Sequence, residues 1–191
     1  MKRKKRMMFE FDLQRFATNA IPEVLNDFRV YNEGETNDLG VATIELPNLE
    51  NMTQDISGVG MAGEVDAPVL GHYASMETKI NWRTPTKAAV RMSGGGGVSL
   101  EACGAVQEWD SGANEYRIVS YRVVIRGRSK SYEQGSFEAG NTTDSANTIE
   151  TTYLKSDING ETVREIDKYG YKDINGGTDV LSAVRSAIGM A

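Results

Sequence analysis

The stretch HYASMETKINWR, residues 72–83, decides the fold because its side chains alternate in character with a period of two residues. In an extended strand, successive side chains point to opposite faces of the sheet. His72, Ala74, Met76, Thr78, Ile80 and Trp82 share one face, and Tyr73, Ser75, Glu77, Lys79, Asn81 and Arg83 share the other. The pattern predicts one strand with a core face and a solvent face, as in an antiparallel sheet.

After this strand, the sequence predicts a short helix over TPTKAAVRM, residues 84–92. Thr84 is the expected N-cap, Pro85 suits the first turn, and good helix formers follow. The four glycines of residues 94–97 end the helix, and they lack the Lys-Ser/Thr of a phosphate-binding loop. A further strand is expected at residues 98–109.

Two later segments predict a long central strand and a hairpin. In YRIVSYRVVIRGR, residues 116–128, one face carries Val119, Tyr121, Val123 and Ile125, and the other carries Arg122 and Arg126. In TIETTYLKSDINGETVREID, residues 148–167, Asn159-Gly160 separates two strand-like segments. Asn-Gly suits the two-residue turn of a β-hairpin, so we expect a hairpin here.

The remaining periodic segments lie near the ends of the chain. Residues 28–31 and 41–46 are strand-like and are separated by turn residues, which makes them a hairpin candidate. Near the C-terminus, Thr178 or Asp179 is the expected N-cap of an amphipathic helix that ends at Gly189. We expect its apolar face to pack on the body through Val180, Leu181, Val184 and Ile188.

Together these segments predict a mainly β fold, a sandwich or barrel with two or three short helices. The 191 residues, 39% of them hydrophobic, fit one globular domain. We place this domain at residues 21–191 and a separate N-terminal arm at residues 1–20.

The N-terminal arm combines a basic run, residues 2–6, with four large apolar residues: Phe9, Phe11, Leu13 and Phe16. Their spacing fits a helix or a strand. Glu10 and Asp12 interrupt the apolar stretch, so it does not resemble the core of a secretory signal. We expect the arm to dock on its own subunit or on a neighbour.

Charge argues against nucleic-acid binding by the folded body. The basic run holds five of the 21 Lys and Arg residues, which leaves 16 against 27 Asp and Glu, a net charge of −11. A body of this charge repels phosphate. No stretch approaches the ~20 apolar residues of a membrane span, so we expect no membrane anchoring.

Gly58, Gly60 and Gly63 reproduce the spacing G-x-G-x-x-G of a dinucleotide-binding fingerprint. That fingerprint needs a strand before the glycines and a helix that begins at them, because the helix N-terminus holds the pyrophosphate. No apolar strand precedes these glycines, and Pro68 follows too closely for the helix. We therefore interpret the segment as a long flexible loop.

The sequence carries no signature of an enzyme, a metal site or a cofactor. With one cysteine, Cys103, and one histidine, His72, it cannot assemble a Cys/His metal site or an intramolecular disulfide. We expect Cys103 to be a buried, inert thiol and His72 to be a strand residue held by a hydrogen bond.

Four stretches in order resemble the major tail tube protein family of contractile-tailed phages and phage-tail-like bacteriocins. They are FRVYNEGE with LGVATIELPNL (28–35, 39–49), YRVVIRGRSKSYEQGSFEAG (121–140), INGETVREID (158–167) and INGGTDVLSAVRSAIG (174–189). The resemblance spans nearly all of residues 21–189. It implies two packed antiparallel sheets with flanking helices, and hexameric rings that stack into the inner tube of a contractile tail.

The resemblance also implies a role for the glycine-rich loop. In the family, a long loop after the second strand reaches the next ring, and it corresponds here to residues 48–69. The expected ring-stacking residues are Ser57, Gly58, Val59, Gly60, Met61, Ala62, Gly63 and Glu64. Their glycines would permit tight turns and close backbone approach.

The partners implied by the resemblance are further copies of the chain, the tail sheath protein, and the tape measure and baseplate proteins. In a phage, DNA would pass through the lumen without specific binding. The expected location is the tail tube of a virion or phage-tail-like particle, assembled in the cytoplasm of the bacterial host. The sequence leaves open whether the tube serves a phage or a headless bacteriocin.

The polar face of the opening stretch is a candidate for the channel wall. We expect Glu77, Lys79 and Asn81 to face the lumen, with Glu101 and Glu150 from neighbouring strands. A wall of negative potential would keep DNA from adhering, because fixed cations would hold phosphates. An ordinary solvated outer face is the alternative.

A second functional hypothesis belongs to a different class. The chain could be a monomeric β-barrel that binds a small ligand in a pocket, with the glycine-rich loop at residues 58–63 as a lid. Rings seen by microscopy would favour the tube, and a monomer stabilised by a ligand would favour the barrel.

Overall fold

The computed structural model describes residues 20–58, 60 and 62–190. Antiparallel strands dominate this part of the chain, and two helices of six residues accompany them. The elements are β1 (Ala20–Asn32), β2 (Thr43–Glu45), β3 (Asn51–Ile56), β4 (Val65–Tyr73), β5 (Glu77–Trp82), α1 (Lys87–Met92), β6 (Gly97–Asp110), β7 (Glu115–Glu133), β8 (Ser145–Ile158), β9 (Glu161–Asp167), β10 (Lys172–Asn175), β11 (Thr178–Asp179) and α2 (Ser182–Ala187). The predicted mainly β, antiparallel class is confirmed.

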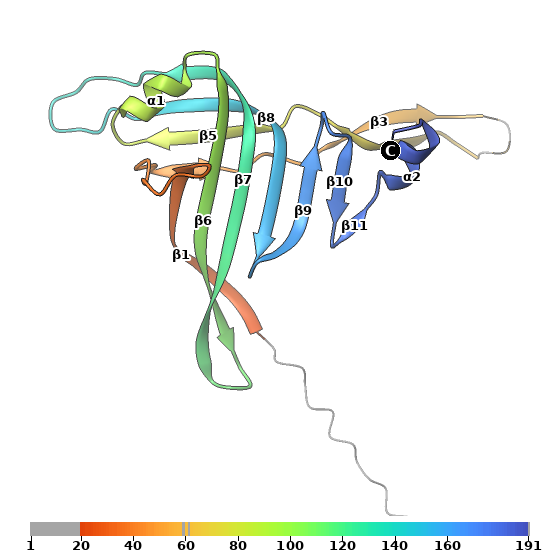
Figure 1. Cartoon of the computed structure of the whole chain (residues 1–191), viewed down its shortest axis with the longest axis horizontal. Coiled ribbons are helices and arrows are strands. Elements are labelled where there is room, and N and C mark those ends of the chain that lie inside the picture. The colour runs from red at the N-terminus through yellow and green to blue at the C-terminus, as the bar shows by residue number, and fades with distance from the viewer. Residues whose placement is uncertain (1–19, 59, 61, 191) are drawn as a thin grey trace, which may run out of the picture.

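Nine of these strands form one sheet, and β3 and β4 form a separate two-stranded ribbon. The main path of the large sheet is β1-β6-β7-β8-β9-β10-β11, with β5 paired to β8 and β2 paired to β5. In Figure 1, β2 and β5 cross the direction of β6 and β7, so the large sheet turns back over itself. The two layers of the core therefore come from one continuous sheet.

The core lies between these two layers. It is built from fully buried side chains of β5, β6, β7, β8 and α1, which include Ile80, Trp82, Ala89, Leu100, Ile125 and Ile149. Two buried polar contacts fix the register: the Trp82 indole donates to the Asn147 side chain at 2.8 Å, and the Asn147 amide donates to the Ala89 carbonyl at 3.1 Å. Satisfied buried groups of this kind hold α1 over the sheet.

The predicted strand at residues 72–83 is in fact two strands that share one alternation. Met76, Thr78, Ile80 and Trp82 are buried, as predicted, but residues 74–76 separate β4 from β5. The chain changes partner there, because β4 pairs with β3 and β5 pairs with β8. His72 is exposed in β4, and its contact with the Tyr171 hydroxyl is 3.5 Å long.

The predicted hairpin of residues 28–31 and 41–46 is wrong. Strand β1 pairs with β6 and β2 pairs with β5, and a single bridge joins Tyr31 to Asp38. The turn residues between the two segments form a loop in which Gly34 and Gly40 have positive φ. Both segments contain strands, as predicted, but each strand pairs with a strand that is distant in sequence.

The predicted long strands and the Asn-Gly hairpin are confirmed. Strand β7 lies between β6 and β8, with Val123 and Ile125 buried. The β8–β9 turn has φ of 50° at Asn159 and 80° at Gly160, as a type I′ turn requires. Local turn chemistry sets the register of this hairpin.

The first helix forms as predicted, two residues later than expected. Thr86, not Thr84, is the N-cap of α1, because its hydroxyl accepts from the Ala89 N–H at 3.1 Å. The second helix is shorter than predicted, since residues 178–179 form strand β11 and Leu181 precedes the helix. Gly189, with φ of 76°, ends it as expected.

One glycine in the sheet allows an approach that a larger residue would block. Gly127 lies at a bulge between β7 and β8, where an added Cβ would meet the Glu150 carbonyl oxygen at 2.2 Å. We expect Gly127→Ala to destabilise the subunit by about 1–3 kcal/mol, because backbone must move to admit the methyl group. Urea unfolding of unassembled subunits measures this change.

The matched control is Gly97→Ala, because a Cβ at that strand glycine meets nothing within 4 Å. We expect it to be neutral or stabilising by up to about 1 kcal/mol. Equal destabilisation of the two variants would contradict the packing argument.

Candidate assembly surfaces

The glycine-rich segment caps a projecting arm. Strands β3 and β4 form an antiparallel ribbon that extends away from the body at the right of Figure 1, and every residue of β3 is exposed. The predicted irregular loop of residues 48–69 is thus largely a β-hairpin. The expected stacking residues Ser57, Gly58, Gly60, Ala62, Gly63 and Glu64 lie at its tip, and Val59 and Met61 lie outside the described residues.

This geometry differs from that of a dinucleotide site. The glycines join two antiparallel strands, whereas a pyrophosphate site needs a helix after them. Only Gly60 among the three fingerprint glycines has a φ, +100°, that favours glycine, and all three have open space around them. Glycine is therefore required by conformation at one position of the tip.

The arm is amphipathic across its two strands. Ile56 lies opposite Val65, and both side chains are about half exposed. Asp55 lies directly opposite Asp66, which places two carboxylates side by side. Directly opposed like charges destabilise a strand pair, and two-stranded ribbons are marginal alone. The arm therefore presents exposed apolar and acidic groups on its described residues.

The base of the arm is fixed by a polar cluster that the sequence did not reveal. The Tyr73 hydroxyl at the end of β4 donates to Asp173 of β10 at 2.6 Å, and Arg164 of β9 pairs with the same carboxylate at 2.6 Å. Burial and this hydrogen bond raise the pKa of Tyr73. Because Tyr73 is 91 positions from Arg164 and 100 positions from Asp173, only the folded sheet brings it to this pair.

Leu181 also supports the base of the arm. It is buried, and its side chain lies so close to Gly71 of β4 that an added Cβ would meet it at 2.5 Å. Of the other positions expected to pack the terminal helix, Val184 is half-buried, and Val180 and Ile188 are exposed. Leu181 therefore packs within the subunit, whereas the side chains of Val180 and Ile188 are open to solvent.

The residues expected in a channel wall share the face of the large sheet that lies opposite the core. On β5 the polar positions alternate with buried Thr78, Ile80 and Trp82. Glu150 lies opposite Glu77 in the neighbouring strand, and Glu101 alternates with buried residues of β6. The structure therefore brings Glu77, Lys79, Asn81, Glu101 and Glu150 to one face.

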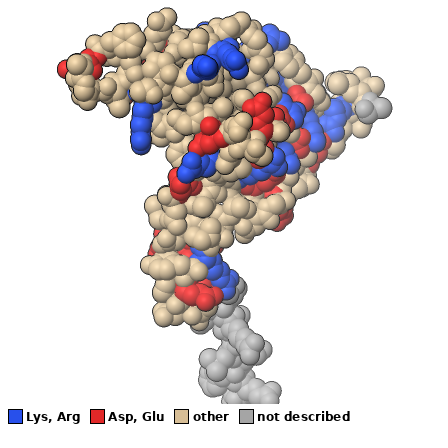
Figure 2. All heavy atoms as spheres, turned by 60° about the vertical axis from the view of Figure 1, so that its left-hand side comes forward, with Lys and Arg blue, Asp and Glu red and all other residues tan. Residues whose placement is uncertain are grey.

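The carboxylates of this face are paired with cations. Glu77 pairs with Lys130, Glu101 with Arg122 at 2.6 Å, and Glu150 with Lys168 at 3.5 Å. The hydrogen bond from its basic partner is the main cause that lowers the pKa of Glu77 and of Glu101. Figure 2 shows acidic and basic side chains interleaved over one region of the surface. Each of these three carboxylates on the face therefore has a basic partner.

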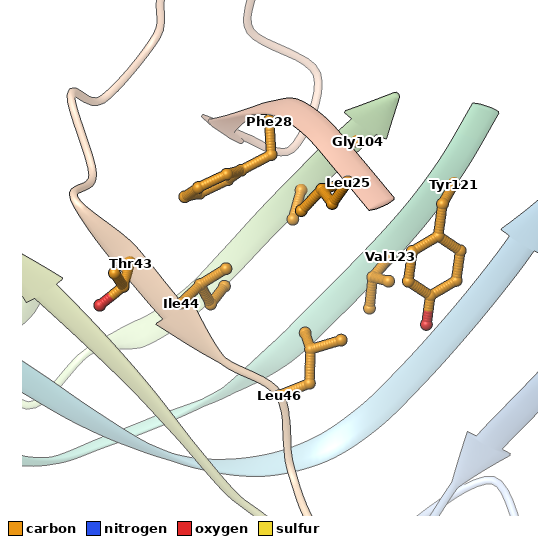
Figure 3. Close-up of a pocket in the computed structure, with 9 residues that line it drawn as sticks. Leu25, Phe28, Thr43, Ile44, Leu46, Gly104, Tyr121 and Val123 are labelled. Carbon is orange, nitrogen blue, oxygen red and sulfur yellow. The ribbon is translucent and has the colours of Figure 1, made fainter. Parts of the chain in front are cut away.

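An apolar recess of about 260 Å³ opens between β1 and β2. Figure 3 shows Leu25 and Phe28 of β1 facing Ile44 and Leu46 across it, with Tyr121 and Val123 of β7 at its side. None of its lining residues belongs to the arm, so this recess gives no support to the hypothesis of a ligand pocket with residues 58–63 as a lid.

Side chains that could ligate a metal are not clustered in the described part of the chain. No group of three or more His, Cys, Asp or Glu side chains there could hold a metal ion. Cys103 is half-buried, less than expected, and burial is the main cause that raises the pKa of its thiol. None of the described helices is long and apolar enough to cross a membrane.

Comparison with known proteins identifies the family of this chain. Residues 22–189 match the family described as Phage tail tube protein FII. This chain belongs to that family. It is also 27% identical to the tail tube protein of Escherichia phage P2 over 176 residues, which cover 90% of this chain and 99% of the relative.

Family membership identifies the chain as a phage tail tube protein, a structural component of the virion and part of its contractile tail. The matched region begins just inside β1 and ends just after α2. It therefore includes the arm, the large sheet and both helices. The predicted N-terminal arm, apart from Ala20, lies outside the described residues.

We expect the ion pairs of the sheet face to lose their stabilising effect in acid. The folded pKa of Glu101 lies below its usual 4.5, mainly because Arg122 donates hydrogen bonds to it. A lowered pKa stabilises the fold above the usual pKa, and that stabilisation is lost as the pH falls through the folded value. We expect Glu101→Gln to lose stability at neutral pH and to lose less on acidification than the wild type.

Urea unfolding of unassembled subunits between about pH 3 and pH 7 measures this difference. Glu161→Gln is the matched control, because Glu161 is exposed at the β8–β9 turn. Parallel pH profiles for the wild type and Glu101→Gln would contradict the prediction.

Proposed function

We propose that this tail tube protein forms hexameric rings that stack into a tube, and that the β3–β4 arm makes the contact on which stacking depends. The arm is the observation that carries the proposal. It leaves the body, exposes apolar residues on both strands and opposes two carboxylates, so it gains most of its stability from a partner. The resemblance to contractile tail tubes supports six subunits per ring.

The polar cluster at its base suits the arm to this role. Tyr73, Arg164 and Asp173 hold the last residues of β4 against β9 and β10, while the tip remains free of the body. A short rigid base limits the directions in which the arm can point and reduces the ordering cost of binding. The subunit thus presents the arm already aimed at its target.

The ion-paired face of the large sheet is the proposed wall of the channel. Each carboxylate there engages a Lys or Arg, so few cations remain free to bind a phosphate. DNA could then slide past a wall that neither holds nor strongly repels it. This proposal differs from the predicted wall of net negative charge, because the carboxylates of the wall are paired with Lys and Arg side chains.

The further partners follow from the position of the tube in a contractile tail. The outer surface of the tube would meet the tail sheath protein, the lumen would hold the tape measure protein during assembly, and one end would meet the baseplate. In a phage the tube conducts DNA, and in a headless particle it would breach the target envelope.

Removing the arm tests the proposal. Thr53 lies opposite Pro68, so an Asn-Gly turn in place of residues 54–67 closes the ribbon at its base. We expect the variant to unfold at nearly the wild-type temperature, because β3 contributes no buried residue, and to form no tubes. Thermal unfolding and negative-stain microscopy measure the two outcomes.

A shorter replacement of residues 57–64 alone is the control that separates the tip from the strands. Tubes of normal length from the variant without the arm would overturn the proposed role of the arm.

The channel wall is tested by charge. Glu77→Lys should create a repelling pair with Lys130 and place free cations on the wall. We expect tubes of this variant to retain a fluorescent oligonucleotide at low salt and release it at high salt, whereas wild-type tubes retain little. Glu161→Lys, at the exposed β8–β9 turn, is the control. Equal retention by both variants would place Glu77 outside the lumen.

A further inference from the structure

A groove beside α1 is the second unpartnered surface of the subunit. It has a volume of about 560 Å³ and is lined by Pro85, Val90, Tyr132 and Phe137, among others. Val90 is half exposed, and Phe137 is almost fully exposed at 96%. A large aromatic side chain so open to water is costly to leave uncovered and marks a contact surface.

Basic residues flank this groove. Pro85 and Val90 also line an adjoining hollow, whose other residues include Lys87 and Arg91. Lys87 and Arg91 are four positions apart on α1, so they lie on the same side of the helix and repel each other. In Figure 2 the upper surface carries Lys and Arg side chains set among uncharged residues.

The arm carries acidic residues, opposite in charge to those beside the groove, and exposed apolar residues. It carries the opposed pair Asp55 and Asp66 on one face of the ribbon and Ile56 and Val65 on the other face, because successive side chains of a strand alternate. Side chains opposed across two strands and side chains four apart on a helix both have Cβ separations of about 5–6 Å. The two carboxylates repel each other, and so do the two basic side chains. Contact between the acidic pair and the basic pair would relieve both repulsions.

No ion pair within the described residues involves these four charges. Their charge is therefore available to a second molecule. A ribbon that lies in a groove contacts the two walls with its two faces, so the acidic face would meet the basic residues and the apolar face would be buried on the opposite wall.

Position in the molecule favours a contact between copies. The arm projects at one end of the longest axis, and α1 lies toward the other end (Figure 1). A subunit cannot reach its own groove with this arm, but a neighbour can. Different surfaces at opposite ends of a subunit are what a heterologous, repeating contact requires.

We infer that the groove beside α1 in one subunit receives the β3–β4 arm of a second copy of the chain. One face of the ribbon carries Asp55 and Asp66, which pair with Lys87 and Arg91 on α1. The opposite face carries Ile56 and Val65, which cover Phe137 on the other wall of the groove. This inference rests on the proposed role of the arm in assembly and names the surface that the arm binds.

Charge exchange tests the pairing. Asp55→Lys with Asp66→Lys, and separately Lys87→Glu with Arg91→Glu, should each raise the protein concentration needed for tube formation by about tenfold or more. The variant that combines all four substitutions should restore assembly to near the wild-type threshold. Sedimentation and negative-stain microscopy measure assembly, and Glu161→Lys is the matched charge control.

The outcomes distinguish this inference from the proposed function. Loss of tubes in both double variants without recovery in the combined variant would overturn the pairing. Unchanged assembly in both double variants, when the variant without the arm forms no tubes, would overturn this inference and leave the role of the arm intact. Assembly without the arm would overturn both.

Cross-linking gives a direct readout that does not depend on tube formation. In a Cys103→Ser background, Ile56→Cys and Phe137→Cys in one chain should give a ladder of disulfide-linked oligomers on oxidation. Glu161→Cys with Phe137→Cys is the control and should give no ladder. A cross-link from Phe137→Cys to a cysteine placed in residues 9–16, with none to Ile56→Cys, would assign the groove to the N-terminal segment and overturn the proposal.

Discussion

Strand β8 hydrogen-bonds to β7 along one edge and divides its other edge between β5 and β9. Its first half continues into the layer of β2 and β5, and its second half continues into β9, β10 and β11. The bulge opposite Gly127 marks the change between the halves and permits the close approach of the Glu150 carbonyl. Through this edge, the first half of β8 joins the layer that covers the core, and the second half joins the strands that hold the base of the arm.

Strands β5 and β9 follow one another along the same edge of β8. The chain between β2 and β5 leaves the sheet near this point. It does so as the β3–β4 ribbon, and the Tyr73 hydroxyl meets Asp173 where the ribbon rejoins the body. The fold thus separates two tasks. A closed, well-packed core supplies stability, and an extension with little burial of its own is left for contact with other molecules.

The sequence predicted those parts of the fold whose signals are local. The alternation around Ile80, the long strand through Val123 and the Asn-Gly turn each depend on neighbouring residues, and each is confirmed. The pairing of β1 with β6 and the break before β5 depend on residues far away in sequence, so the local turn residues predicted the wrong strand partner there.

The candidate surfaces were predictable to a similar extent. The glycine-rich segment marked the tip of the arm by composition, and family resemblance gave it a purpose. Nothing local pointed to Arg164 or Asp173 as supports of the arm, because their roles exist only after β9 and β10 pair. Likewise, no local pattern predicted that Arg122, twenty-one positions after Glu101, would pair with that carboxylate.

The placement of the arm at one end of the subunit gives any polymer built through it a polarity. One end of such a tube exposes a rim of unbound arms, and the opposite end exposes the surfaces that receive them. The two rims differ in shape and charge, so a starting complex can recognise one and a terminating complex the other. A single asymmetric extension is therefore enough to let a tube of identical subunits grow in one direction and be capped at a defined end.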